Sequence, residues 1–199
     1  MSNVVKTLIG CCTIHLCIGS VYALSVLYPA IMAKTGWDIT VLVIGFSLTI
    51  LSLGLTAALH QRIFNGHRVY YVISYGIISW FIASSLLFSN IILEHGYVTL
   101  HYAFSLIWGF SIGLLYVVPI NVVSGLDFSK KSLASGAVVG CFGLGSILTA
   151  KIFSNFIDFS GVSILFFAFI CAALMLFGVK HVNMTELIEK PKNFNRDKD

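Results

Sequence analysis

Six long apolar stretches dominate the chain, and short polar segments separate them. They carry no Asp, Glu, Lys or Arg and run over Thr7–Ala33, Ile39–Gln61, Val69–Leu93, His95–Leu126, Ser132–Ala150 (continuing past Lys151 to Ile157) and Phe159–Val179. A helix needs about 20 residues, at a rise of 1.5 Å per residue, to cross a hydrocarbon core about 30 Å thick. Each stretch reaches or nearly reaches that length, so the pattern predicts six membrane-spanning helices.

The continuity of these stretches decides the fold class. A membrane β-barrel would show segments of roughly ten residues that alternate between apolar and polar positions. In lipid, a continuous apolar segment satisfies its backbone hydrogen bonds internally only as a helix. We therefore expect an all-α, polytopic membrane bundle over residues 1–179 and a polar cytoplasmic tail over residues 180–199, with no room for a soluble catalytic domain.

Composition supports lipid as the solvent. Apolar residues make up 58% of the 199 residues and fully charged residues 10%, against about 45–50% and about 25% in soluble domains. A soluble fold of this composition would leave large apolar patches in water. The lipid bilayer is thus the first expected partner, and nothing in the sequence indicates nucleic-acid binding.

The positions of the basic residues predict the orientation. Ten Lys and Arg residues fall before the first span, in the second and fourth connections or after the sixth span, whereas Lys34 alone lies in the other connections. Positive residues are retained on the cytoplasmic side of a membrane. We expect a multi-pass protein of the inner or plasma membrane with both termini in the cytoplasm.

Two spans carry small and polar residues at helical spacing. His15, Gly19 and Tyr22 share one face of the first span. The fourth span has a comparable face, followed by a polar residue, formed by Tyr102, Ser105, Gly109, Gly113, Tyr116 and then Asn121. These faces indicate a cavity that binds a solute through Tyr22, Tyr116, His15 and Asn121; the alternative is that the tyrosines only pack and that His15 is a hydrogen-bonded structural residue.

The same spacing indicates an internal repeat. Gly19-x-x-Tyr22 and Gly113-x-x-Tyr116 occupy comparable places in the first and second groups of three spans, and a proline follows each. This arrangement is typical of the inverted three-plus-three repeat of secondary transporters, in which corresponding interrupted helices line the path of the solute.

Lys151 is the only full charge inside a span. A charge within the membrane is costly unless it is hydrated or paired, so it is a candidate functional group. Lys151 lies about 10 Å outward from the centre of its span near Leu144, at 1.5 Å per residue. Its amine either extends to the outer headgroups or attracts an anionic substrate.

The fifth span is rich in glycine. Gly136, Gly140, Gly143 and Gly145 recur at short intervals in it. A phosphate-binding glycine loop needs a strand before it and a helix after it, which an apolar span does not provide. Small residues at this spacing let two helices approach closely in lipid, so we expect these four to pack against another helix.

The spans lack the residue sets that several classes of enzyme require. No span carries a Ser, His and Asp set, a His-Glu-x-x-His helix or paired carboxylates, so we expect no enzyme activity. All five cysteines lie within spans, where thiols behave as small apolar groups. We predict no disulfide framework, no metal site and no cofactor.

Taken together, these features resemble the amino-terminal half of a major facilitator superfamily transporter. Within it, Gly19-Ser20-Val21-Tyr22-Ala23, Gly45-Phe46-Ser47-Leu48, Gly109-x-x-x-Gly113-x-x-Tyr116 and Ser135-Gly136 through Gly145 resemble the oxalate/formate antiporter group. The resemblance implies half of a twelve-helix fold and, by alternating access, either exchange of a small organic anion or symport of an anion with a proton. It implies that Tyr22 and Tyr116 face the substrate.

The resemblance also bears on gating and partners. Gly66 and Arg68 match the end of the superfamily's second-connection gating motif, whereas no Asp or Glu occurs from Ile39 to Leu93. The resemblance further implies a partner, either a second six-helix half or another copy in a homodimer. The alternative is a non-transporting membrane module or a degenerate remnant of a carrier.

Overall fold

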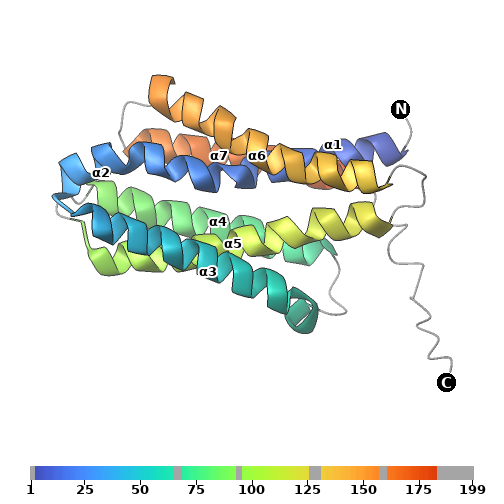
Figure 1. Cartoon of the computed structure of the whole chain (residues 1–199), viewed down its shortest axis with the longest axis horizontal. Coiled ribbons are helices and arrows are strands. Elements are labelled where there is room, and N and C mark those ends of the chain that lie inside the picture. Colours follow the sequence, from blue (N-terminus) through green and yellow to red (C-terminus); the bar gives the residue numbers. More distant parts are fainter. Residues whose placement is uncertain (1–2, 65–68, 93–95, 126–130, 157–160, 183–199) are drawn as a thin grey trace.

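The computed structural model describes residues 3–64, 69–92, 96–125, 131–156 and 161–182, and these residues contain helices but no strand. The elements are α1 (Asn3–Ile18), η1 (Gly19–Leu27, a 3-10 helix), α2 (Tyr28–Thr35), α3 (Ile39–Phe64), α4 (Val69–Ile92), α5 (Val98–Gly125), α6 (Lys131–Phe156) and α7 (Gly161–His181). The long helices lie side by side in one elongated bundle (Figure 1).

Six helical segments are long and apolar enough to cross a membrane. They are Val4–Thr35, Ile39–His60, Tyr71–Asn90, Val98–Gly125, Ser132–Asn155 and Val162–His181. The first of them is continuous through α1, η1 and α2. The prediction of an all-α, six-helix, multi-pass bundle is therefore confirmed, and the last helix extends two residues beyond the predicted boundary at residue 179. The predicted polar tail lies outside the described residues from residue 183 onward.

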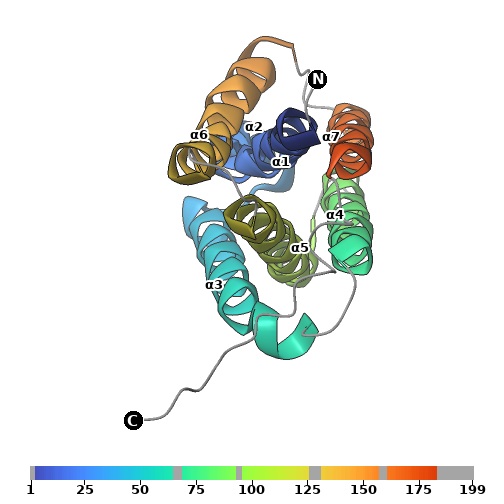
Figure 2. The same ribbon diagram turned by 90° about the vertical axis from the view of Figure 1, so that its right-hand side faces the viewer.

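Two central helices organise the bundle. Seen along its length, α1 and α5 lie in the middle, α3 and α6 lie on one side, and α4 and α7 lie on the other (Figure 2). Helix α5 packs mainly on α3 and α4, whereas α1 and η1 pack on α6 and α7. Each central helix thus packs on the last two spans of the other group of three.

The helices meet where glycine removes the side chain. A Cβ atom added at Gly19 would meet the carbonyl oxygen of Phe142 in α6, and one added at Gly145 would meet the carbonyl oxygen of Leu16 in α1. The two backbones therefore touch at a reciprocal pair of glycines. Similar close contacts join α1 to α7 at Gly10 and Gly178 and α5 to α3 at Gly109 and Gly113.

Only one of the four predicted packing glycines of α6 packs within the described part of the chain. Gly145 contacts α1, whereas a Cβ atom at Gly136, Gly140 or Gly143 would have no described atom within 4 Å. These three residues therefore contact no other described helix, because α6 faces the bundle through Val138 and Gly145, and their packing stays a prediction. Gly136 and Gly143 each lie two residues before one of these positions, about 200° around the helix, on its outer face.

The outer surface of the bundle suits lipid. Large apolar side chains are exposed along all six spans. Among the exposed charged residues, Arg62, Lys180 and Lys34 lie in the last turns of α3, α7 and α2, and Lys6 lies near the start of α1. Lys151 lies within α6. The side of the membrane that each end faces stays a prediction.

The Gly145 contact can be tested by adding one methyl group. We expect Gly145→Ala to lower the free energy of unfolding by about 1–3 kcal/mol, because the new methyl group forces α1 and α6 apart. Gly143→Ala, two residues away in open space, should leave this free energy unchanged or raise it by up to about 1 kcal/mol. Reversible unfolding in mixed detergent micelles measures both. Equal losses in the two variants would contradict the packing described here.

Two native thiol pairs test the placement of α1. The Cys12 thiol contacts that of Cys141 in α6, and the Cys17 thiol contacts that of Cys171 in α7. Iodine, which enters membranes, should oxidise each pair to a disulfide that mass spectrometry of peptides detects. Cys12→Ala should abolish the link to α6 even though Cys11 remains next to it. A Cys11–Cys141 link in the unmodified chain would show that α1 has a different rotation.

Candidate functional site

Three of the five predicted binding residues meet in one cluster of rings. The ring centroids of His15 and Tyr116 are 5.1 Å apart. Phe142 lies between the helices, with its ring centroid 5.6 Å from that of Tyr22 and 5.3 Å from that of Tyr116. Phe46 completes the cluster at 6.1 Å from Tyr22. We call these five residues the aromatic site.

Four of the six spans contribute to the aromatic site. His15 and Tyr22 come from α1 and η1, Phe46 from α3, Tyr116 from α5 and Phe142 from α6. The site lies on the glycine contact between α1 and α6, because Phe142 is the residue whose carbonyl oxygen faces Gly19. The close approach of these two backbones brings the rings of different spans within reach of one another.

The site has a buried part and an exposed part. His15 is fully buried, Tyr116 is partly buried, and Tyr22 is 49% exposed. Among the described residues, neither tyrosine hydroxyl has a hydrogen-bond partner. A phenolic hydroxyl both donates and accepts a hydrogen bond. The site therefore offers two hydroxyl groups to a molecule outside the bundle.

His15 forms the floor of the site. The carbonyl of Cys11, one turn earlier in α1, interacts with the ring, but no well-oriented hydrogen bond reaches either ring nitrogen from the described residues. Tyr116 and Phe142 cover the ring and separate it from the surface. His15 is thus buried, and the Cys11 carbonyl is a polar group that interacts with its ring.

The backbone at the site departs from the α-helix. Nine residues from Gly19 to Leu27 form a 3-10 helix, an unusual length for this conformation. Proline at position 29 has no N–H to donate to the Ser25 carbonyl four residues earlier. The N–H of Tyr28 donates to that carbonyl instead, in the i to i−3 pattern. The missing proline donor thus accounts for the tighter turn at the end of η1.

The other predicted residues lie outside the aromatic site. Asn121 is exposed five residues past Tyr116, about 7 Å along α5. Lys151 is exposed nine residues past Phe142, about 13 Å along α6. The two helices run in opposite directions (Figure 1). Asn121 and Lys151 are thus displaced toward opposite ends of the bundle. Gly66 and Arg68 lie outside the described residues.

Most of the predicted polar face of α5 packs instead of lining a cavity. Ser105, Gly109 and Gly113 are buried, and the two glycines contact Thr49 and Thr56 of α3. The small side chains of this face let α3 approach α5 closely, which accounts for their spacing. Tyr116, at the end of the face, extends past α3 and reaches the site.

Phe46 and Phe142 were not predicted as site residues. Phe46 belongs to a segment that carries the resemblance, but nothing in that segment assigns it a contact. Phe142 lies in an apolar span in which any side chain could face lipid or another helix. Only the rotation of α6 about its axis places it between Tyr22 and Tyr116.

The described residues contain no group of three or more His, Cys, Asp or Glu side chains that could hold a metal ion. The chemistry visible at the aromatic site is therefore hydrogen bonding by tyrosine hydroxyls and contact with aromatic rings.

Comparisons of this chain with protein-family models, with curated proteins and with solved structures found no match.

Proposed function

We propose that this chain is one six-helix unit of a secondary transporter that moves a small organic anion across the membrane by alternating access. The observation that carries the proposal is the aromatic site, where two tyrosines without described hydrogen-bond partners border a span whose α-helix changes to a 3-10 helix. Interrupted helices that pair with corresponding helices of a repeat are typical of transporter binding sites. The resemblance to the oxalate/formate antiporter group supports the same reading.

The depth of the site supports binding in the middle of the membrane. Tyr22 lies 18 residues after Val4 and 13 residues before Thr35, the ends of the first span. The tyrosines are therefore far from both headgroup layers. A polar hydroxyl exposed at this depth is unfavourable against lipid tails. We infer that it faces a solute path.

The shape of the unit implies a partner. The aromatic site is open on the surface of the bundle, since Tyr22 is 49% exposed, so a single unit supplies one wall of a path. A second six-helix unit, either another copy of this chain or a separate polypeptide, would supply the opposite wall. Rocking of the two units would expose the site to each side in turn.

The groups present favour an anion. Tyrosine hydroxyls donate hydrogen bonds to carboxylate oxygens, and bonds to a charged acceptor are stronger than neutral ones. Lys151, about 13 Å from Phe142 along α6, adds a positive charge at one entrance, as expected for attraction of an anion.

The alternative function, a membrane module that transports nothing, predicts no solute flux.

Exchange of labelled carboxylates in liposomes tests the proposal. The purified chain should exchange small mono- or dicarboxylates, and Tyr22→Phe and Tyr116→Phe should each lower the rate about tenfold, because each removes one hydrogen bond to a charged group. Tyr75→Phe is the matched control, since Tyr75 has the same 49% exposure as Tyr22 but lies on α4.

Two results would contradict the proposal. One is the absence of exchange for every carboxylate, and every other organic solute, in liposomes where crosslinking shows paired chains. The other is exchange at an unaltered rate in both tyrosine variants.

We expect Lys151 to affect the solute concentration that half-saturates transport. We expect Lys151→Gln to raise the half-saturating solute concentration several-fold and to leave the maximal rate unchanged, because the amine attracts the anion without touching it at the site. Lys6→Gln, which removes an exposed charge at the opposite end, serves as control for entry from the Lys151 end. Added salt should reduce the difference between Lys151→Gln and the unmodified chain. A lower maximal rate with unaltered half-saturation would contradict this role.

A further inference from the structure

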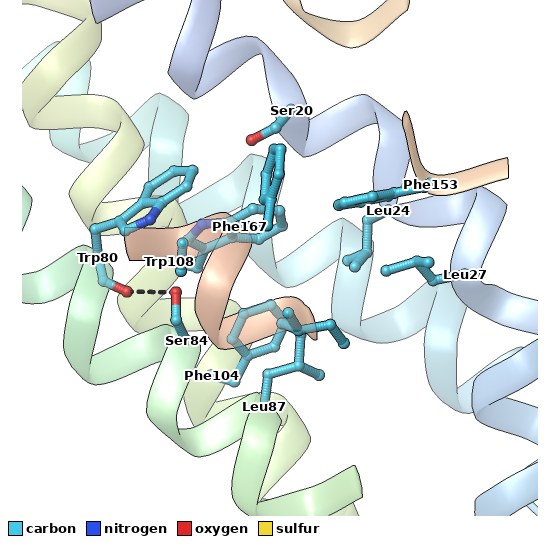
Figure 3. A pocket seen from close by; sticks show the side chains of 12 residues that line it. Ser20, Leu24, Leu27, Trp80, Ser84, Leu87, Phe104, Trp108, Phe153 and Phe167 are labelled. Atoms are coloured by element: carbon cyan, nitrogen blue, oxygen red, sulfur yellow. Dashed lines mark hydrogen bonds between the residues drawn. The ribbon is translucent and has the colours of Figure 1, made fainter. Parts of the chain in front are cut away.

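A second group of polar side chains surrounds a small internal cavity, separate from the aromatic site. The cavity has a volume of about 30 Å³ and lies between η1, α4, α5, α6 and α7. Its polar lining consists of Ser20 from η1, Trp80 and Ser84 from α4, and Trp108 from α5. Apolar side chains, among them Leu24 and Phe153, close the opposite side in the view of Figure 3.

Three of the polar groups are buried without a partner. Ser20 and Trp80 are each 2% exposed and Trp108 is 6% exposed. The Ser20 hydroxyl and both indole N–H groups make no hydrogen bond to any described protein group. A single unpaired polar atom at such depth is uncommon in native proteins. Three around one cavity indicate a molecule that pairs with them.

The lining restricts the charge and the hydrogen-bonding character of that molecule. An indole N–H only donates, so the molecule must accept hydrogen bonds. The Ser84 hydroxyl donates its hydrogen bond to the carbonyl oxygen of Trp80, at 2.8 Å. Toward the cavity, its oxygen can therefore only accept a hydrogen bond. No ionisable side chain among the described residues lines the cavity, which makes a buried anion costly. The molecule is thus uncharged and both accepts and donates.

We propose that this cavity is a binding site for water. Its volume admits one or two water molecules, and a buried water typically makes about three hydrogen bonds. Water accepts from the indole N–H groups of Trp80 and Trp108 and donates to the hydroxyl oxygens of Ser20 and Ser84. Because Ser20 belongs to η1 and the indoles belong to α4 and α5, the bound water fastens the 3-10 segment to the core of the bundle. This site does not depend on a transport function.

Nuclear magnetic resonance of the unmodified chain in detergent tests the site directly. The indole N–H signals of Trp80 and Trp108, assigned with the two Trp→Phe variants, should show dipolar cross-peaks to water and yet exchange slowly with deuterium. Addition of chloride should leave both signals in place. Absence of the water cross-peaks would overturn the proposal, and so would shifts that saturate with chloride, which would identify an anion site.

A double-mutant cycle tests whether the groups share one ligand. Ser20→Ala and Trp108→Phe should each raise the unfolding equilibrium constant about five- to tenfold, because each removes a hydrogen bond to the same water. The double variant should raise it by clearly less than the product of the two factors. Full multiplication of the two factors would overturn the shared water.

Ser105→Ala provides the matched control for the cycle. Ser105 is as deeply buried, but its hydroxyl donates to the His101 carbonyl at 2.8 Å and it does not line the cavity. Combined with Trp80→Phe, it should give the full product of the two single effects. Since the resonance experiment uses the unmodified chain, a variant that fails to fold does not remove the test.

Discussion

In lipid the helices of this chain have almost no hydrophobic driving force for association, and the packing of the bundle reflects this constraint. An apolar side chain gains almost nothing by leaving lipid tails for another helix, so association depends on close van der Waals contact. The chain provides that contact by placing glycine where backbones cross, at Gly19 and Gly145 between α1 and α6 and at Gly10 and Gly178 between α1 and α7. The positions of the other side chains, including the rings of the aromatic site, follow from these crossings.

The parts of the fold that could be predicted from the sequence are those that depend on solvent alone. Absence of charge over more than 20 residues predicts a span because burial of an unpaired charge in lipid is costly. Helical spacing also placed His15 and Tyr22 on one face of the first span. In the structure His15 contacts Tyr116, and Phe142 lies between Tyr22 and Tyr116. These features need no knowledge of how one helix is rotated against another.

The sequence does not show how each helix is rotated about its own axis. In α6, Gly136, Gly140 and Gly143 share one face and Gly145 lies on the opposite face, and spacing alone cannot tell which of these two faces contacts α1. The face of α5 that carries Gly109 and Gly113 has the composition of a cavity wall and of a packing surface alike. Trp80 and Trp108 lie in spans whose neighbouring residues are just as apolar, and only tertiary packing brings both indoles to one cavity.

The 3-10 segment makes the first span longer than an α-helix of the same residues would be. A 3-10 helix rises about 2.0 Å per residue and an α-helix 1.5 Å, so rewinding the nine residues of η1 would shorten the span by about 4.5 Å. The same change would turn α2 about 180° relative to α1, since each residue advances by about 120° in one form and about 100° in the other. This short stretch of backbone thus sets both the length of the first span and the direction in which its Lys34 end faces.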